Sequence, residues 1–146
     1  MRPDLHDAPR PIDVALLSAY LATEVVDAHG RAWSGASAIG LDRDVWVVTA
    51  ENPFSEKQDD AANAAAMSDL AAEIRRAGHE PTALVGRAPD LSWSEECFGV
   101  DDVDPADVRR WGRDRGQHAV FWLTVDEHRV VSCWSGEVLA SRPRAR

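Results

Sequence analysis

Polar side chains that can bind a ligand or transfer a proton gather around one short segment, Thr49-Ala50-Glu51-Asn52-Pro53-Phe54-Ser55. Hydroxyl and amide groups both donate and accept hydrogen bonds, and a carboxylate accepts them, so this set suits a small polar ligand. The segment joins an apolar run to a long amphipathic run, as where a strand passes into a helix. With polar residues further along the chain, the candidate ligand-binding residues are Thr49, Asn52, Ser55, Asn63, Trp93, Glu95 and Gln117.

The carboxylate of Glu95 is the candidate for acid or base catalysis. Glu95 and Glu96 are consecutive residues of a predicted strand, so only one of them can face a pocket on a given side of the sheet. The alternative is a carboxylate that is exposed at the start of the strand or bonded to backbone amides. The sequence places no base beside the hydroxyl of Thr49 or Ser55, and it does not decide whether the protein is an enzyme.

The other candidates also have structural interpretations. Asn52 and Asn63 can tie a strand-to-helix turn to nearby backbone groups, and Ser55 can cap the helix that follows. Gln117 can fix a ligand or cap the preceding helix. Trp93 lies in a predicted loop, where a pocket wall is the favoured role for its ring.

Spacings typical of metal, phosphate and nucleophile sites are absent from the sequence. The 5 histidines show neither an H-x-x-x-H nor an H-E-x-x-H pattern, and neither cysteine has a nearby ligand partner, so no metal and no cofactor are expected. There is no glycine-rich phosphate loop. Cys97 and His118 would form a nucleophile and a base if their strands approached, although buried strand residues of these types more often only pack.

The charge balance excludes one class of partner and suits another. The net charge is -9, from 16 Lys and Arg against 25 Asp and Glu in 146 residues. Nucleic-acid binding depends on basic side chains that neutralise phosphates, so no nucleic-acid partner is expected, whereas an acidic surface suits a basic protein. The absence of a C-x-x-C pair and of a secretion signal predicts a cytoplasmic protein. No apolar run approaches the roughly 20 residues that cross a bilayer, so no membrane partner is expected.

Hydrophobic periodicity predicts one α+β domain over residues 11–140, between a flexible lead-in (1–10) and a disordered basic tail (141–146). An N-terminal helix is expected between Ile12 and Val26. The expected core elements are a buried strand at 44–50, a helix from a capping box at Ser55 and Gln58 to Gly78, strands at 81–86 and 95–100, a helix opened by Asp104, and strands at 118–124 and 129–133.

This order is β-α-β-β-α-β plus one C-terminal strand, which is the order of a ferredoxin-like split βαβ sandwich. Such a sandwich has its helices on one face of a mainly antiparallel sheet. The end of its first strand, the starts of its third and fourth strands and the start of its first helix share one edge. The candidate ligand-binding residues are therefore expected to lie together at that edge.

Several sequence elements carry a resemblance to a known family. They are Tyr20-Leu21-Ala22-Thr23, residues 49–55 with Asn63, Trp93-Ser94-Glu95-Glu96, and Gly116-Gln117-His118-Ala119. Over roughly residues 20–122 the chain resembles the bacterial family catalogued as domain of unknown function 3293. That family usually has a basic residue where Ala66 stands, so the resemblance implies no arginine-dependent anion site here. It implies positions for a site and no established activity.

The sequence favours a small cytoplasmic protein that binds a small polar or nucleotide-like ligand at one sheet edge. The alternative is a non-catalytic interaction module, of the inhibitor or immunity type, that presents its acidic surface to a basic protein. Its acidic patch would include Asp101, Asp102, Asp104 and Asp107. Ferredoxin-like sheets commonly pair, so a homodimer is compatible with both hypotheses.

Overall fold

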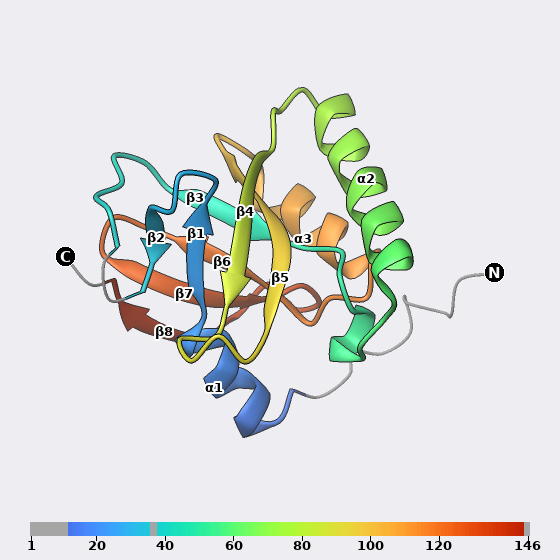
Figure 1. Cartoon of the computed structure of the whole chain (residues 1–146). Helices are drawn as coiled ribbons and strands as arrows, with labels where there is room; N and C mark the ends of the chain where they lie inside the picture. The colour runs from blue at the N-terminus through green and yellow to red at the C-terminus, as the bar shows by residue number, and fades with distance from the viewer. Residues whose placement is uncertain (1–11, 36–37, 145–146) are drawn as a thin grey trace.

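Eight antiparallel strands form one curled sheet in this computed structural model, which describes residues 12–35 and 38–144 (Figure 1). The elements are α1 (Val14–Ala22), β1 (Glu24–Asp27), β2 (Ala32–Ser34), β3 (Val45–Val48), the 3-10 turn η1 (Pro53–Ser55), α2 (Asp60–Arg76), β4 (Thr82–Arg87), β5 (Ser94–Asp101), α3 (Pro105–Arg113), β6 (Ala119–Leu123), β7 (Glu127–Ser132) and β8 (Val138–Pro143). The strand order is β2-β1-β4-β5-β3-β6-β7-β8, and every neighbouring pair is antiparallel. The fold is therefore of the α+β class.

Strand β3 lies between β5 and β6, as its run of β-branched and aromatic residues predicts for a buried strand. All four of its residues are buried. Trp46 and Val48 pack with residues of α2 and with Trp111 of α3 on one face of the sheet. Val45 and Val47 pack on the opposite face, against residues of β1, β4 and β5. The sheet thus has a core on each face, and the helices α2 and α3 share one of them.

The helix predicted to start at Ser55 begins instead at Asp60, so the predicted capping box is wrong. Ser55 lies in η1 with a φ of 62°, whereas an N-cap residue has extended backbone. The N-cap is Asp59, whose side chain accepts a 2.7 Å hydrogen bond from the Ala62 N–H. The end of the helix agrees with the prediction, because Gly78 follows it with a φ of 93°.

The other predicted core elements are present, with boundaries that differ by a few residues. Helix α3 has the predicted Asp104 as its N-cap and Pro105 as its first residue. Strands β4 and β5 form a hairpin, as do β6 and β7. None of the helices in the described residues has the length and apolar character needed to span a membrane.

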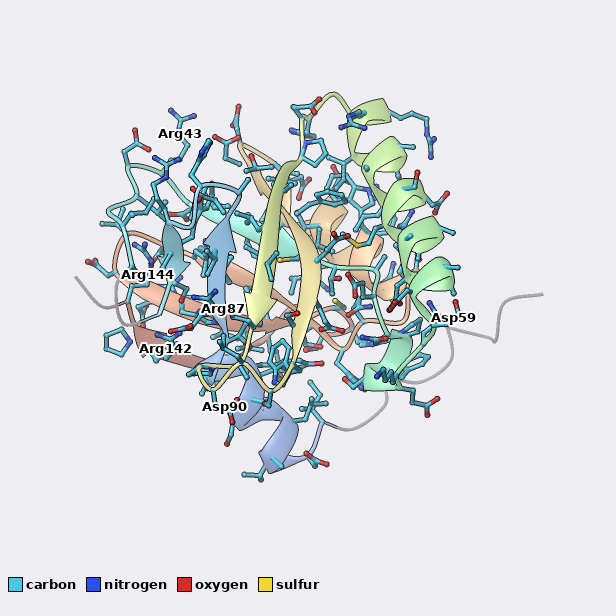
Figure 2. All side chains as sticks on the ribbon, viewed as in Figure 1. Arg43, Asp59, Arg87, Asp90, Arg142 and Arg144 are labelled. Carbon is cyan, nitrogen blue, oxygen red and sulfur yellow. The ribbon has the colours of Figure 1, made fainter. Side chains whose placement is uncertain are left out.

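Side chains join the two edges of the curled sheet. Ser34 on β2 lies 2.6 Å from the Nδ1 atom of His128 on β7, measured from its hydroxyl oxygen. Arg142 on β8 donates to the same hydroxyl at 3.1 Å, and Arg144 donates to the Trp33 carbonyl on β2 at 2.9 Å. Figure 2 labels both arginines, which lie on the side of the molecule where β2 and β8 approach each other. These hydrogen bonds between the two edges stabilise the curled shape of the sheet.

Strand β8 departs from the prediction of a disordered basic tail over residues 141–146. Residues 138–143 pair with β7, and the Arg144 side chain behind them is buried. The guanidinium group of Arg144 donates to backbone carbonyls of β2 and of the β6–β7 turn. The amino-acid composition of the segment does not predict these long-range hydrogen bonds. Residues 145–146 and the predicted lead-in, residues 1–10, lie outside the described residues.

Candidate functional site

The turn after β3 has an unusual backbone. Asn52, Phe54 and Ser55 have φ angles of 48°, 56° and 62°, in the left-handed region that residues other than glycine seldom enter. The turn is held from outside by a 2.7 Å hydrogen bond from the Phe54 N–H to the carbonyl of Gly116. Gly116 itself has a φ of 73°, and a Cβ at this position would lie 2.9 Å from the Cβ of Pro53. Left-handed residues of this kind cost free energy and are concentrated at functional sites.

The side chains of Asn52 and Asn63 bind each other and form, with Gln58, a clasp that fixes this turn. The Oδ1 atom of Asn63 accepts from the Asn52 N–H at 3.0 Å and from the Gln58 amide at 3.1 Å. The Oδ1 atom of Asn52 accepts from the Asn63 amide at 3.1 Å and from the Gln58 N–H at 2.8 Å. One donor of the clasp points elsewhere: the Nδ2 of Asn52 donates to Glu95 at 2.6 Å.

Thr49 and Gln117 also hold this segment. The Thr49 hydroxyl donates to the Glu96 carbonyl at 2.6 Å and accepts from the Glu51 N–H at 3.1 Å. The Gln117 amide donates to the Glu51 carbonyl at 3.0 Å. Four of the seven residues selected from the sequence, namely Thr49, Asn52, Asn63 and Gln117, therefore use their side chains to position the backbone, which was the structural alternative for the asparagines.

Glu95 is the acidic group that this framework positions. Its Oε2 accepts the bond from Asn52, and within the described residues no group donates to Oε1. Burial raises the pKa of Glu95, the bond from Asn52 lowers it, and the negative charge of Glu51 raises it further. A half-buried carboxyl group with a raised pKa can accept or donate a proton nearer to neutral pH than an exposed one.

Two adjoining cavities connect these residues. The smaller has a volume of about 60 Å³, and the larger, called the cleft below, has about 580 Å³. The smaller cavity is lined by six of the predicted residues, Thr49, Asn52, Ser55, Trp93, Glu95 and Gln117. Asn63 lines the cleft, together with Asn52, Ser55, Trp93 and Glu95. The structure thus brings all seven predicted positions to the end of the sheet where β3 ends and β5 and β6 begin.

Tyr20 and Glu51 are among the residues of the cleft that sequence reasoning missed. The Tyr20 hydroxyl, on α1, lies 3.2 Å from the Ser55 hydroxyl, and burial raises the pKa of Tyr20 to about 12. The Oε2 of Glu51 accepts from the Glu96 N–H at 2.7 Å, and burial raises the pKa of Glu51 as well. Both residues belong to the segments that carry the family resemblance, and that was the signal that could have identified them.

The alternative nucleophile and base, Cys97 and His118, are not brought together. Cys97 packs with Val45 and Val47 on the face of the sheet opposite α2 and α3, and burial raises the pKa of its thiol far above the usual range. His118 immediately precedes β6, and Val120, two residues later, packs on the opposite face with α2 and α3. Alternate strand residues share a face, so His118 points away from Cys97. No group of three or more potential metal ligands occurs within residues 12–35 and 38–144.

The comparisons with known proteins bear on the segment that contains this site. The model of the family described as "Protein of unknown function (DUF3293)" matches residues 48–120, which run from the end of β3 to the start of β6. No curated protein and no solved structure matches the chain. The matched segment is half of the chain and includes the turn, the clasp and Glu95. The resemblance seen in the sequence is confirmed, and the protein belongs to the DUF3293 family.

Proposed function

We propose that the protein binds a small polar or nucleotide-like ligand in the cleft. The observation that carries the proposal is the carboxylate of Glu95, which the clasp holds through one oxygen while the other oxygen has no partner within the described residues. A carboxylate fixed in this way is ready to accept a hydrogen bond from a ligand without reorganising.

The surrounding cleft supports the proposal. Its volume of about 580 Å³ falls in the range of roughly 300–1,000 Å³ typical of small-molecule sites. Trp93 and Tyr20 supply aromatic surface next to Glu95, and the Ser55 hydroxyl supplies a further polar group. A few polar groups among apolar walls are the usual composition of a binding site.

The fold around the cleft supports the ferredoxin-like arrangement. Four inner strands lie in the order β6-β3-β5-β4, all antiparallel, with α2 between β3 and β4 in the chain and α3 between β5 and β6. A split βαβ sandwich has this order of strands and helices.

The two cysteines are free and buried, which is consistent with a reducing compartment such as the cytoplasm.

A thermal-shift screen of nucleosides and small polar metabolites tests the proposal. A ligand at 100 times its dissociation constant stabilises a protein by about 2.7 kcal/mol, which a melting curve resolves. The stabilisation should disappear in Glu95→Gln and Trp93→Leu, and it should persist in Glu96→Gln, a matched change at an exposed neighbour. Ligands whose stabilisation depends on Glu95 would then be assayed for turnover, with Glu95 as the expected proton donor or acceptor. The absence of any Glu95-dependent shift would overturn the proposal.

A second candidate function, binding of a basic protein, is favoured by a groove at the other end of the sheet. The groove has a volume of about 880 Å³, and its lining carries four exposed aspartates, Asp42, Asp44, Asp102 and Asp104, against two arginines, Arg43 and Arg109. Asp42 lies 3.6 Å from Arg43, and four acids against two arginines leave an excess of two negative charges. Trp122 and Val103 supply apolar surface between the aspartates. We call this the acidic groove. Of the residues expected from the sequence, Asp101 pairs instead with Arg43 and Asp107 pairs with Arg110.

Binding of an oligoarginine peptide tests this second candidate. Affinity should fall as salt rises, because exposed charges are screened within about 8 Å at physiological ionic strength. The double variant Asp42→Asn, Asp102→Asn should weaken binding, whereas Glu56→Gln, an exposed acid elsewhere, should have little effect. Equal weakening by both variants would show that net charge rather than the groove is responsible. Size-exclusion chromatography of the native protein would test whether it forms a homodimer.

A further inference from the structure

The lining of the cleft is unbalanced in charge. Three carboxylates line it, those of Glu51, Asp60 and Glu95, against one cation, the exposed Lys57. Within residues 12–35 and 38–144 none of the three forms a salt bridge. By contrast, Glu24 and Glu73, which are half-buried like Glu51 and Glu95, are paired with arginines. The three negative charges in the cleft are therefore balanced only in part by the protein itself, through Lys57.

Glu51 and Glu95 stand close enough to repel each other. The negative charge of Glu51 raises the pKa of Glu95, and each carboxylate has one oxygen fixed, Glu51 by the Glu96 N–H and Glu95 by Asn52. The two side chains cannot easily turn away from each other, because those bonds of 2.7 Å and 2.6 Å would be lost. A positive group between them would remove the repulsion.

We infer, on the basis of the proposed function, that the ligand of the cleft carries a protonated amine or amidine group, which Glu51 and Glu95 hold beside the rings of Tyr20 and Trp93. Aromatic faces attract organic cations, and the Tyr20 and Ser55 oxygens can accept further N–H donors. A phosphate or carboxylate group would instead meet two negative charges. Among nucleotide-like molecules, the cleft therefore favours a base or nucleoside that carries such a cationic group over a phosphorylated nucleotide.

Three probes that share a phenyl ring and differ in charge test this inference: phenethylamine, 2-phenylethanol and phenylacetate. Binding is followed by NMR through the indole N–H of Trp93, at probe concentrations up to the millimolar range. Phenethylamine should bind about tenfold more tightly than 2-phenylethanol, a preference between those expected for a charge pair in bulk water and for one near a protein surface. Phenylacetate should bind more weakly than both.

Matched variants locate the effect. The double variant Glu51→Gln, Glu95→Gln should reduce the preference for phenethylamine to near unity, and Glu95→Gln alone should reduce it in part. Glu56→Gln, at an exposed acid outside the lining of the cleft, should leave the preference unchanged. Lys57→Gln, which removes the one cation of the lining, should tighten phenethylamine binding by about twofold, as for an exposed charge.

The outcomes separate this inference from the proposed function. If 2-phenylethanol or phenylacetate binds as well as phenethylamine and the binding still depends on Glu95, the cleft is a binding site and the inferred charge of the ligand is wrong. If no probe perturbs the Trp93 signal, the inferred charge is likewise wrong. The proposed function is then decided separately by the metabolite screen.

Discussion

The cleft and the acidic groove lie at opposite ends of the same sheet and carry the same sign of charge, but they hold that charge differently. In the cleft, Glu95 and Glu51 are half-buried, and each is fixed by a short hydrogen bond, from Asn52 and from the Glu96 N–H. In the groove, aspartates such as Asp42 and Asp102 are exposed to solvent. The first arrangement concentrates negative charge at a point, and the second spreads it over a surface.

The difference separates two kinds of recognition. Charge that is withdrawn from water interacts strongly with a ligand that replaces the solvent, and a fixed carboxylate sets the direction of the bond. Charge that stays in water acts at a distance, is screened by salt, and mainly affects how fast and how specifically a large partner approaches. The cleft is thus suited to a small ligand and the groove to a protein.

Loss of the clasp is expected to have the largest effect on stability. Asn63→Ala leaves the Asn52 N–H and the Gln58 amide without their acceptor, and a buried group left unsatisfied costs about 1–3 kcal/mol. We expect urea unfolding to show a loss near the upper end of that range. At the other end of the sheet, Asp102→Asn should change stability by less than about 0.5 kcal/mol. Equal losses at the two positions would remove the contrast between a fixed end and an open end.

Two glycines, one at each end of the sheet, allow the rigidity of the cleft and of the groove to be compared. Gly116 near the cleft and Gly136 at the groove have φ angles of 73° and 77°, so alanine at either position costs about 1–2 kcal/mol for its left-handed backbone. A Cβ on Gly116 would also press on Pro53 of the turn, whereas on Gly136 it would meet the movable end of the Arg109 side chain. Gly116→Ala should therefore be the more destabilising change by thermal melting. The reverse order would indicate that the turn can shift without cost.

The sequence was sufficient for the elements whose signals are local. Strand β3 follows from its β-branched and aromatic residues, and the start of α3 follows from Asp104 and Pro105. The grouping of Asn52, Glu95 and Gln117 at one end of the sheet followed from the order of the strands, since antiparallel neighbours bring the end of one strand beside the start of the next.

The features that were missed depend on contacts between distant residues. Ser55 would cap a helix in isolation, but the turn is held in the left-handed region with the help of the Phe54 bond to Gly116, 62 residues later in the chain. The segment from Ser141 to Arg144 resembles a tail in composition, and Arg142 and Arg144 find their partners on β2. Tyr20 fits the apolar face of a helix, and its hydroxyl acquires a role only because α1 lies beside the turn. No local pattern encodes these contacts.

A smaller effect is expected at the groove from the cap of α3. Asp104→Ala removes the acceptor of the 2.9 Å bond from the Ala106 N–H, and loss of an N-cap costs about 1 kcal/mol. Asp104→Asn retains an oxygen acceptor and should recover most of this loss in urea unfolding. Both variants should weaken binding of the oligoarginine peptide, because both remove the charge. If Asp104→Asn binds the peptide as the native protein does, the groove does not act through this aspartate.

The smallest effect, and the one that bears most directly on the cleft, is the pH dependence caused by Glu95. Its pKa in the folded protein is raised, first by burial, so the folded state binds more protons than the unfolded state between the two pKa values. The contribution of Glu95 to the free energy of unfolding therefore falls as pH rises through that window. At pH values above the window, this contribution stays at its lowest value. Glu95→Gln removes the ionisable group. Its stability relative to the native protein should rise with pH through the same window and then level off.

Urea unfolding of both proteins from about pH 4 to about pH 8 measures this difference. The groups that face Glu95 are Asn52, Glu51, Tyr20 and Cys97, and the three that ionise are present in both proteins, so their own titration largely cancels. A flat curve for Glu95→Gln would mean that the Glu95 carboxylate is as well solvated as the aspartates of the groove. The two ends of the sheet would then hold their charge in the same way, and the argument for a small ligand in the cleft would lose its physical basis.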